Sequence, residues 1–205
     1  MKVLSVDFDV IMGPDIDLYN PKVPVYYTLE QMIAEHPMLT GLRIDFEHYQ
    51  KLINILLEVS QNIEYQNIYV AYSHDAILDF LKNDSDLELV NIDHHHDLGY
   101  DEKDNFEKAT YANWVYYLFK QGKIKKYTWL QNVNSGIIPL NKEENCFFHE
   151  FFYNITKDNY IEQFGYPDKI FICLSPEWVP EHCFPLFCTL LDVLNKQNNY
   201  TLSIQ

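Results

Sequence analysis

The sequence predicts a single α/β domain in which helices flank a mostly parallel central sheet. Apolar runs of strand length alternate with amphipathic runs of helix length. Polar clusters follow several of the apolar runs. Of the 205 residues, 47% are hydrophobic, which is enough to bury one sizeable core, and no repeat or low-complexity linker divides residues 1–205.

β-branched and aromatic runs predict the strands, which we expect at residues 2–9, 66–72, 86–93, 125–133 and 169–176. Helical periodicity or a cap predicts the helices, which we expect at residues 28–36, 45–59, 73–84, 108–123 and 184–199. The stretch from 10 to 26 holds three prolines and a glycine and predicts a long loop. Thr28 and Ser73 are expected helix caps, and Gly122 is an expected helix end. The face expected to be buried on helix 45–59 comprises Phe46, Tyr49, Ile53, Leu56 and Leu57.

The composition of the chain indicates its compartment and its classes of partner. No stretch approaches 20 apolar residues, and the first ten residues lack a signal pattern, so we expect a cytoplasmic protein without a membrane partner. The net charge of −15 argues against nucleic acid and is compatible with metal ions or a cationic substrate. Four cysteines form no C-x-x-C pair, which favours buried thiols over a zinc ribbon.

Polar clusters lie at the carboxyl ends of four expected strands. They are Asp7 with Asp9, Ser73 with His74, the run from Asp93 to Asp97, and the "SPE" at 175–177. Because the carboxyl ends of parallel strands meet at one edge of a sheet, we expect the clusters to form one pocket.

The spacing within these clusters suggests a metal centre. On an extended strand Asp7 and Asp9 would share a side, as would Asp93, His95 and Asp97, while His94 and His96 would face the other side. Same-side spacings of ~6.6 Å can straddle two metal ions ~3.5–4 Å apart. Carboxylates with some imidazole favour manganese or iron over zinc. The expected ligands are Asp7, Asp9, His74, Asp93, His95 and Asp97.

Three segments resemble the motifs of the arginase/ureohydrolase family, and more distantly those of the histone deacetylases of the same fold. "AYSHD" at 71–75 is similar to the family's "GGDH", "DHHHD" at 93–97 to "DAHxD", and "SVDFDVIMGP" at 5–14 to "SxDxD" followed by proline. The last motif opens this chain, whereas it comes third in ordinary arginases, so the order looks circularly permuted. The permuted order and short length resemble the small peptide arginases.

The resemblance implies an arginase/deacetylase-like fold and two Mn²⁺ ions, with iron as an alternative metal. It implies one ion held by His74, Asp93, Asp97 and Asp7, and another held by His95, Asp93, Asp7 and Asp9. Its implied reaction converts arginine residues of a ribosomally made precursor peptide to ornithine and urea. Asp97 would pass a proton to the leaving amine.

Three further residues are expected around the substrate. Glu177, with Glu181 as second choice, would pair with the guanidinium, and Trp178 would stack on it. Asn113 is expected to shape the pocket.

Other functions stay open at this point. A hydrolase of free arginine or agmatine would use the same ligands. "IDHH" also occurs in DHH-type metal phosphoesterases, although 15 basic residues against 30 acids suit phosphate poorly. A non-catalytic, metal-stabilised binding protein is the third alternative, and the oligomeric state is not specified.

Overall fold

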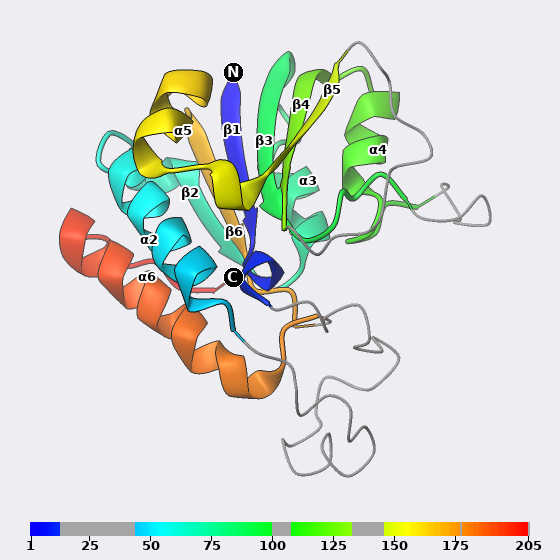
Figure 1. Ribbon diagram of the computed structural model, residues 1–205. Coiled ribbons are helices and arrows are strands. Elements are labelled where there is room, and N and C mark those ends of the chain that lie inside the picture. Colours follow the sequence, from blue (N-terminus) through cyan, green and yellow to red (C-terminus); the bar gives the residue numbers. More distant parts are fainter. Residues whose placement is uncertain (13–43, 100–107, 133–145, 177, 205) are drawn as a thin grey trace, which may run out of the picture.

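Residues 1–12, 44–99, 108–132, 146–176 and 178–204 are described by the structure, a computed structural model (Figure 1). In this part of the chain six strands form one sheet in the order β2-β6-β1-β3-β4-β5, and every neighbouring pair is parallel. The strands are β1 (Lys2–Asp7), β2 (Ile68–Ala71), β3 (Leu87–Asp93), β4 (Ile124–Gln131), β5 (Phe147–Phe151) and β6 (Lys169–Cys173).

Helices cover both faces of this sheet. The helices are α2 (Phe46–Ser60), α3 (Ile77–Phe80), α4 (Trp114–Lys120), α5 (Lys157–Phe164) and α6 (Phe184–Asn198). Figure 1 shows α2, α5 and α6 on one side and α3 with α4 on the other. The three-layer α/β prediction is therefore confirmed, and the sheet is parallel throughout its described strands.

Side chains that alternate between the two faces of each strand contribute to a hydrophobic core on either side of the sheet. Leu4 and Val6 of β1 pack in the cluster with α2, α5 and α6, whereas Val3 packs in the cluster with α3 and α4. β6 repeats the pattern, with Ile170 and Phe171 in different clusters. Because successive side chains point to opposite faces, a strand covered on both faces is apolar at nearly every position.

Several element boundaries differ from the sequence prediction. The strand predicted for 2–9 ends at Asp7 and continues as a 3-10 turn, η1 (Phe8–Ile11). The helix predicted for 73–84 is reduced to a 3-10 turn, η5 (His74–Ala76), and the short α3, and the helix predicted for 108–123 covers only α4. Phe46, predicted to face the core, is 64% exposed. The predicted helix 28–36 lies outside the described residues.

Among the strands and α-helices, the edge strand β5 and the helix α5 were not predicted. The expectation of buried thiols holds for Cys173 and Cys183, but Cys146 is half-buried and Cys188 is exposed. Within the described residues, no helix combines the length and the apolar character that crossing a bilayer requires.

Candidate metal centre

The candidate centre lies at the carboxyl edge of the sheet, around its central strand β1. Asp7 ends β1, Asp93 ends the neighbouring β3, and His74 follows β2 after two residues. β6 lies between β1 and β2 and is followed by Ser175. All six predicted ligands are buried and gather at this edge, while their role as metal ligands stays a prediction.

The chain brings these residues together by turns rather than by strand alternation. Asp9 lies in η1, and the Asp7 side chain, which caps that turn, accepts a hydrogen bond from the Asp9 backbone N–H at 3.2 Å. β3 ends at Asp93, and Asp97 has a left-handed backbone with φ 54°. The predicted extended geometry of both motifs is therefore wrong, because each strand ends at its first aspartate.

Three carboxylate oxygens surround one ring nitrogen of His74. Nδ1 lies 3.1 Å from Asp7 Oδ2, 3.1 Å from Asp97 Oδ2 and 3.3 Å from Asp93 Oδ2. A single imidazole N–H can satisfy one of these acceptors well. Ligand atoms about 2.1 Å from one cation and at right angles to each other lie about 3 Å apart. The spacing thus fits donors arranged around a shared metal ion.

A second group of donors lies around His95. Its Nδ1 lies 2.9 Å from Asp9 Oδ2, and its backbone N–H donates to Asp93 Oδ1 at 2.8 Å. The other oxygen of Asp9 accepts the backbone N–H of His94 at 3.1 Å. We call Asp7, His74 and Asp93 the His74 group and Asp9, Asp93 and His95 the His95 group. Within each group the ligand atoms lie within 4.8 Å of one another, and Asp93 belongs to both.

Burial and like charges make the protein without metal hold protons at this centre. Burial, followed by the charges of Asp97, Asp9 and Asp7, holds the pKa of Asp93 well above its ordinary value. Burial disfavours a charged imidazole, but hydrogen bonds that it donates to Asp7 and Asp97 outweigh burial and raise the pKa of His74 to about 10. A divalent ion can replace these protons, because it compensates the same carboxylates.

Burial would raise the pKa of Asp9 as well, but the opposite result holds there. The hydrogen bond and the charge of His95, together with His94, outweigh burial and lower the pKa of Asp9 below its ordinary value. The pKa of His95 is raised, since its hydrogen bond to Asp9 and the nearby carboxylates overcome the cost of burying the cation. The two carboxylates therefore differ, with Asp93 favouring its protonated form and Asp9 its charged form.

Buried donors and acceptors behind the ligands fix their orientation. Ser5 Oγ lies 2.7 Å from His74 Nε2, so a metal at Nδ1 leaves the Nε2–H to donate to Ser5. Asn91 Nδ2 donates to Asp93 Oδ2 at 2.8 Å, and Ser175 Oγ donates to Asp7 Oδ2 at 2.5 Å. Asp/His ligands with such support can hold a metal ion.

The other two histidines of the motif, His94 and His96, lie in the same loop but outside the two groups. His96 Nδ1 accepts the backbone N–H of Leu98 at 3.1 Å, and the ring stands edge-on to Trp129. Burial lowers the pKa of His96 to about 4, which keeps the imidazole neutral. The ring of His94 stands edge-on to that of His95. Neither residue belongs to a described ligand group.

The predicted substrate residues have different outcomes. Trp178 is half-buried with its ring centroid 4.4 Å from that of His95, beside the centre as expected. The Asn113 side chain bonds the loop backbone instead, accepting from Thr110 N at 2.7 Å and donating to Lys108 O at 3.3 Å. Glu177 lies outside the described residues, and Glu181 is exposed at the start of η7 (Glu181–Cys183).

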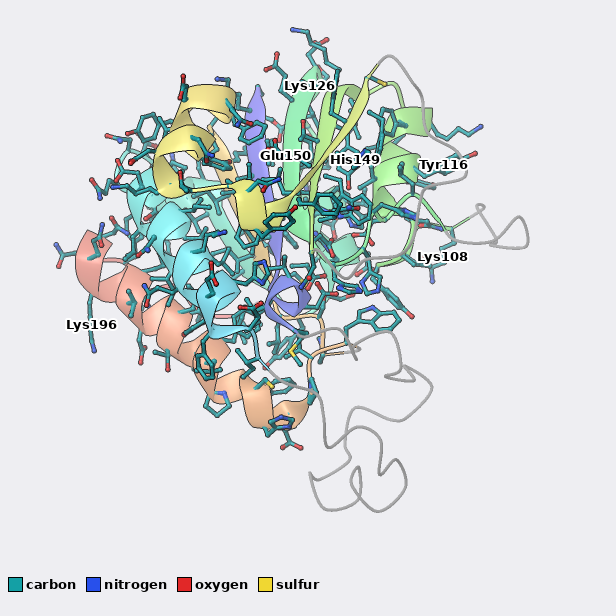
Figure 2. The ribbon with its side chains drawn as sticks, in the orientation of Figure 1. Lys108, Tyr116, Lys126, His149, Glu150 and Lys196 are labelled. Atoms are coloured by element: carbon teal, nitrogen blue, oxygen red, sulfur yellow. The ribbon has the colours of Figure 1, made fainter. Side chains whose placement is uncertain are left out.

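Figure 2 labels His149, whose role sequence reasoning left unassigned. It is exposed on the edge strand β5, in register with Trp129 of β4. Gln131 of β4 is in register with Asp93 at the carboxyl edge. His149 pairs with Trp129, two residues before Gln131, and so lies two positions back from that edge.

Several supporting residues were missed in the sequence. Ser5 and Asn91 each stand two positions before a ligand on the same strand and are in register with each other across β1 and β3. Period-2 spacing would have found them. Ser175 belongs to the "SPE" cluster that was expected in the pocket, and it donates to Asp7 there. Trp114 carries no such signal, because only the packing of α4 brings it to Asp97.

Comparison of the chain with protein-family models, curated proteins and solved structures found no match.

Proposed function

We propose that this protein is a binuclear metal hydrolase. The observation that carries the proposal is the pair of buried Asp/His groups that overlap at Asp93. A shared carboxylate is the arrangement expected for a ligand that bridges two ions. Both groups lie at the carboxyl edge of a parallel sheet, where α/β proteins form their sites.

More particularly, we propose a peptide arginase that converts arginine residues of a ribosomally made precursor peptide to ornithine and urea. The three motif segments that support this resemblance supply all the ligand candidates. The net charge of −15 favours approach of a cationic side chain. The permuted order of the motifs supports a peptide over a free amino acid as substrate.

Manganese is the proposed metal, with iron as the alternative. The two groups offer carboxylate oxygens and imidazole nitrogens and no thiolate among their described members. Such donors suit manganese or iron better than a thiolate-rich zinc site does. His74, Asp93, Asp97 and Asp7 would hold one ion, and His95 and Asp9 would complete the second. When bound, the pair supplies a water activated near neutral pH.

The protein's own residues would orient the substrate and move its proton. Trp178 would stack on the guanidinium beside His95, with Glu177 as the carboxylate partner. Asp97 would pass a proton to the amine of the departing ornithine residue.

Mass spectrometry of an arginine-containing peptide incubated with the Mn²⁺-loaded protein tests the proposal. Guanidine hydrolysis removes about 42 Da per arginine. We expect this loss with the natural sequence, none with Asp93→Ala, and an undiminished loss with Asp192→Ala, which removes an exposed aspartate of α6.

Free arginine and agmatine run in parallel distinguish the related activities. Turnover of only these small molecules would reject the peptide substrate and leave a ureohydrolase. Two bound metal ions without turnover of any of the three would reject guanidine hydrolysis and favour a phosphoesterase or a binding protein, which phosphate release would separate.

A further inference from the structure

The first turn of α4 holds Asp97 from two sides. The Asp97 carbonyl accepts the backbone N–H groups of Val115 at 3.1 Å and Tyr116 at 3.4 Å. Its side chain accepts the indole N–H of Trp114, with 2.5 Å between Nε1 and Oδ2. Asp97 lies beyond the end of β3 and has a left-handed backbone, so its own strand does not fix it.

The Trp114 bond is of a strong kind. Trp114 is fully buried and Asp97 is 4% exposed, so water does not compete for the carboxylate. A hydrogen bond to an ionised acceptor is stronger than a neutral one, and more so away from solvent. Asp97 Oδ2, the oxygen that accepts it, is the one 3.1 Å from His74 Nδ1.

Trp114 also contacts His74 directly. The ring centroids of Trp114 and His74 lie 4.7 Å apart. His74 also stacks on Phe171, with 5.6 Å between the ring centroids and 3° between the ring planes. With Ser5 at Nε2, these rings leave the imidazole little rotational freedom. Trp114 therefore touches both residues assigned to one ion alone, His74 and Asp97.

The His95 group is supported by other residues. Asp9 is held by His94 and His95, and His95 packs against Trp178. Among the described residues, Trp114 contacts Asp97 and His74 but neither Asp9 nor His95. Apart from the shared Asp93, different residues therefore support the two metal positions.

We propose that Trp114 is a positioning residue for one metal ion only, presetting Asp97 and His74 before that ion binds. This inference rests on the binuclear site proposed above, but not on the reaction it performs. Its consequence is a site-selective loss: removing the indole N–H should weaken one of two metal-binding steps and spare the other.

Titration with Mn²⁺ alone, following the EPR signal of free Mn²⁺, tests this without any substrate. We expect two ions per chain for the natural sequence. Trp114→Phe, which keeps an aromatic ring and loses the N–H, should weaken one step by about 10–100-fold, the usual effect of losing such support. The other step should stay within about twofold, since its ligands keep all their partners.

A double-mutant cycle keeps the test independent of general damage to the fold. If Trp114 acts through Asp97, adding Trp114→Phe to Asp97→Asn should cause little further loss at the affected step. Trp129→Phe is the matched control, because it removes a buried indole N–H that donates to the Asp93 backbone carbonyl rather than to a carboxylate. Circular dichroism in EDTA checks that each variant folds.

Equal weakening of both steps, no weakening of either, full additivity in the cycle, or no metal bound by the natural sequence would each overturn the inference. Absence of guanidine hydrolysis with a selective metal loss would contradict only the proposed reaction.

Discussion

At the scale of single residues, Asp93 lies in an environment that lowers the stability of the metal-free protein and that a bound cation would compensate. It is fully buried, accepts hydrogen bonds from His95 N and Asn91 Nδ2, and lies among three other carboxylates. Its folded-state pKa lies above the unfolded one, so its contribution to stability is present below pH 3.8 and is lost as the pH rises. At neutral pH without metal, Asp93 therefore destabilises the fold.

Asp93→Asn should raise the stability of the metal-free protein at pH 7 by roughly 1–2 kcal/mol, because Asn is neutral without having to take up a proton on folding. The Asn91 amide can turn to accept from the new side chain, since its Oδ1 has no hydrogen-bond partner in the described structure. Thermal unfolding in EDTA measures this gain.

Metal should reverse the order of the two proteins. Mn²⁺ at 100 times its dissociation constant stabilises the natural sequence by about 2.7 kcal/mol per site and should leave Asp93→Asn nearly unchanged. Equal stabilisation of both proteins, or a variant less stable in EDTA, would contradict the role given to Asp93.

At the scale of elements, the start of α2 is fixed by a capping carboxylate. Asp45 Oδ1 accepts the backbone N–H of His48 at 3.0 Å, and its Oδ2 lies 2.6 Å from His48 Nδ1. Burial would raise the pKa of Asp45, but the contacts with His48 outweigh it and lower the pKa. The stabilisation is therefore present above the unfolded pKa near 3.8 and is lost as the pH falls through the folded one.

Asp45→Asn keeps a capping oxygen and loses the charge. Urea unfolding should show the variant less stable than the natural sequence at pH 7 by no more than about 1 kcal/mol, because the Asp45 side chain is 37% exposed. The difference should shrink at pH 3. Asp45→Ala is the control, since it loses the cap as well as the charge and should stay about 1 kcal/mol less stable than the natural sequence even at pH 3. A difference that is the same at pH 3 and pH 7 would rule out the charge as its source.

The elements also show what sequence patterns can predict. Strands buried on both faces were recognised because they are continuously apolar, as in β6. α5 was missed because it buries only Tyr160 fully, although its capping box of Thr156 and Asn159 was readable in the sequence. β5 was missed because it is a short edge strand that buries only Phe147 fully.

The sequence predicted which residues gather at the site better than it predicted their geometry. Asp and His at the ends of parallel strands meet at one edge, so the six candidate ligands were expected together, and the structure brings them together there. Their role as metal ligands stays a prediction. The turns after Asp7 and Asp93 depend on tertiary contacts, such as the bonds from Asn132 Nδ2 to the carbonyls of Val10 and Met12. The same holds for Trp114, which reaches Asp97 only through the packing of α4.

At the scale of the whole molecule, the order of the strands in the sheet differs from their order in the sequence. β1 lies at the centre, Val3 pairs with Leu89 on one side and with Lys169 on the other, and β2 pairs with β6 at one edge of the described sheet. The ligands that follow β1 and β3 come from adjacent strands, whereas His74 reaches them across β6. The centre therefore depends on a strand that contributes no ligand to it.

This strand order has a consequence for how the protein folds. All six ligand residues precede position 98, yet β6, which sets the distance between His74 and Asp7, begins only at Lys169. Pairing over such a separation in sequence is slow. During refolding from urea with Mn²⁺ present, metal uptake should therefore coincide with the slowest phase of tryptophan fluorescence. On the proposed function, a nascent chain would thus carry every candidate ligand and still bind no metal until β6 inserts between β1 and β2.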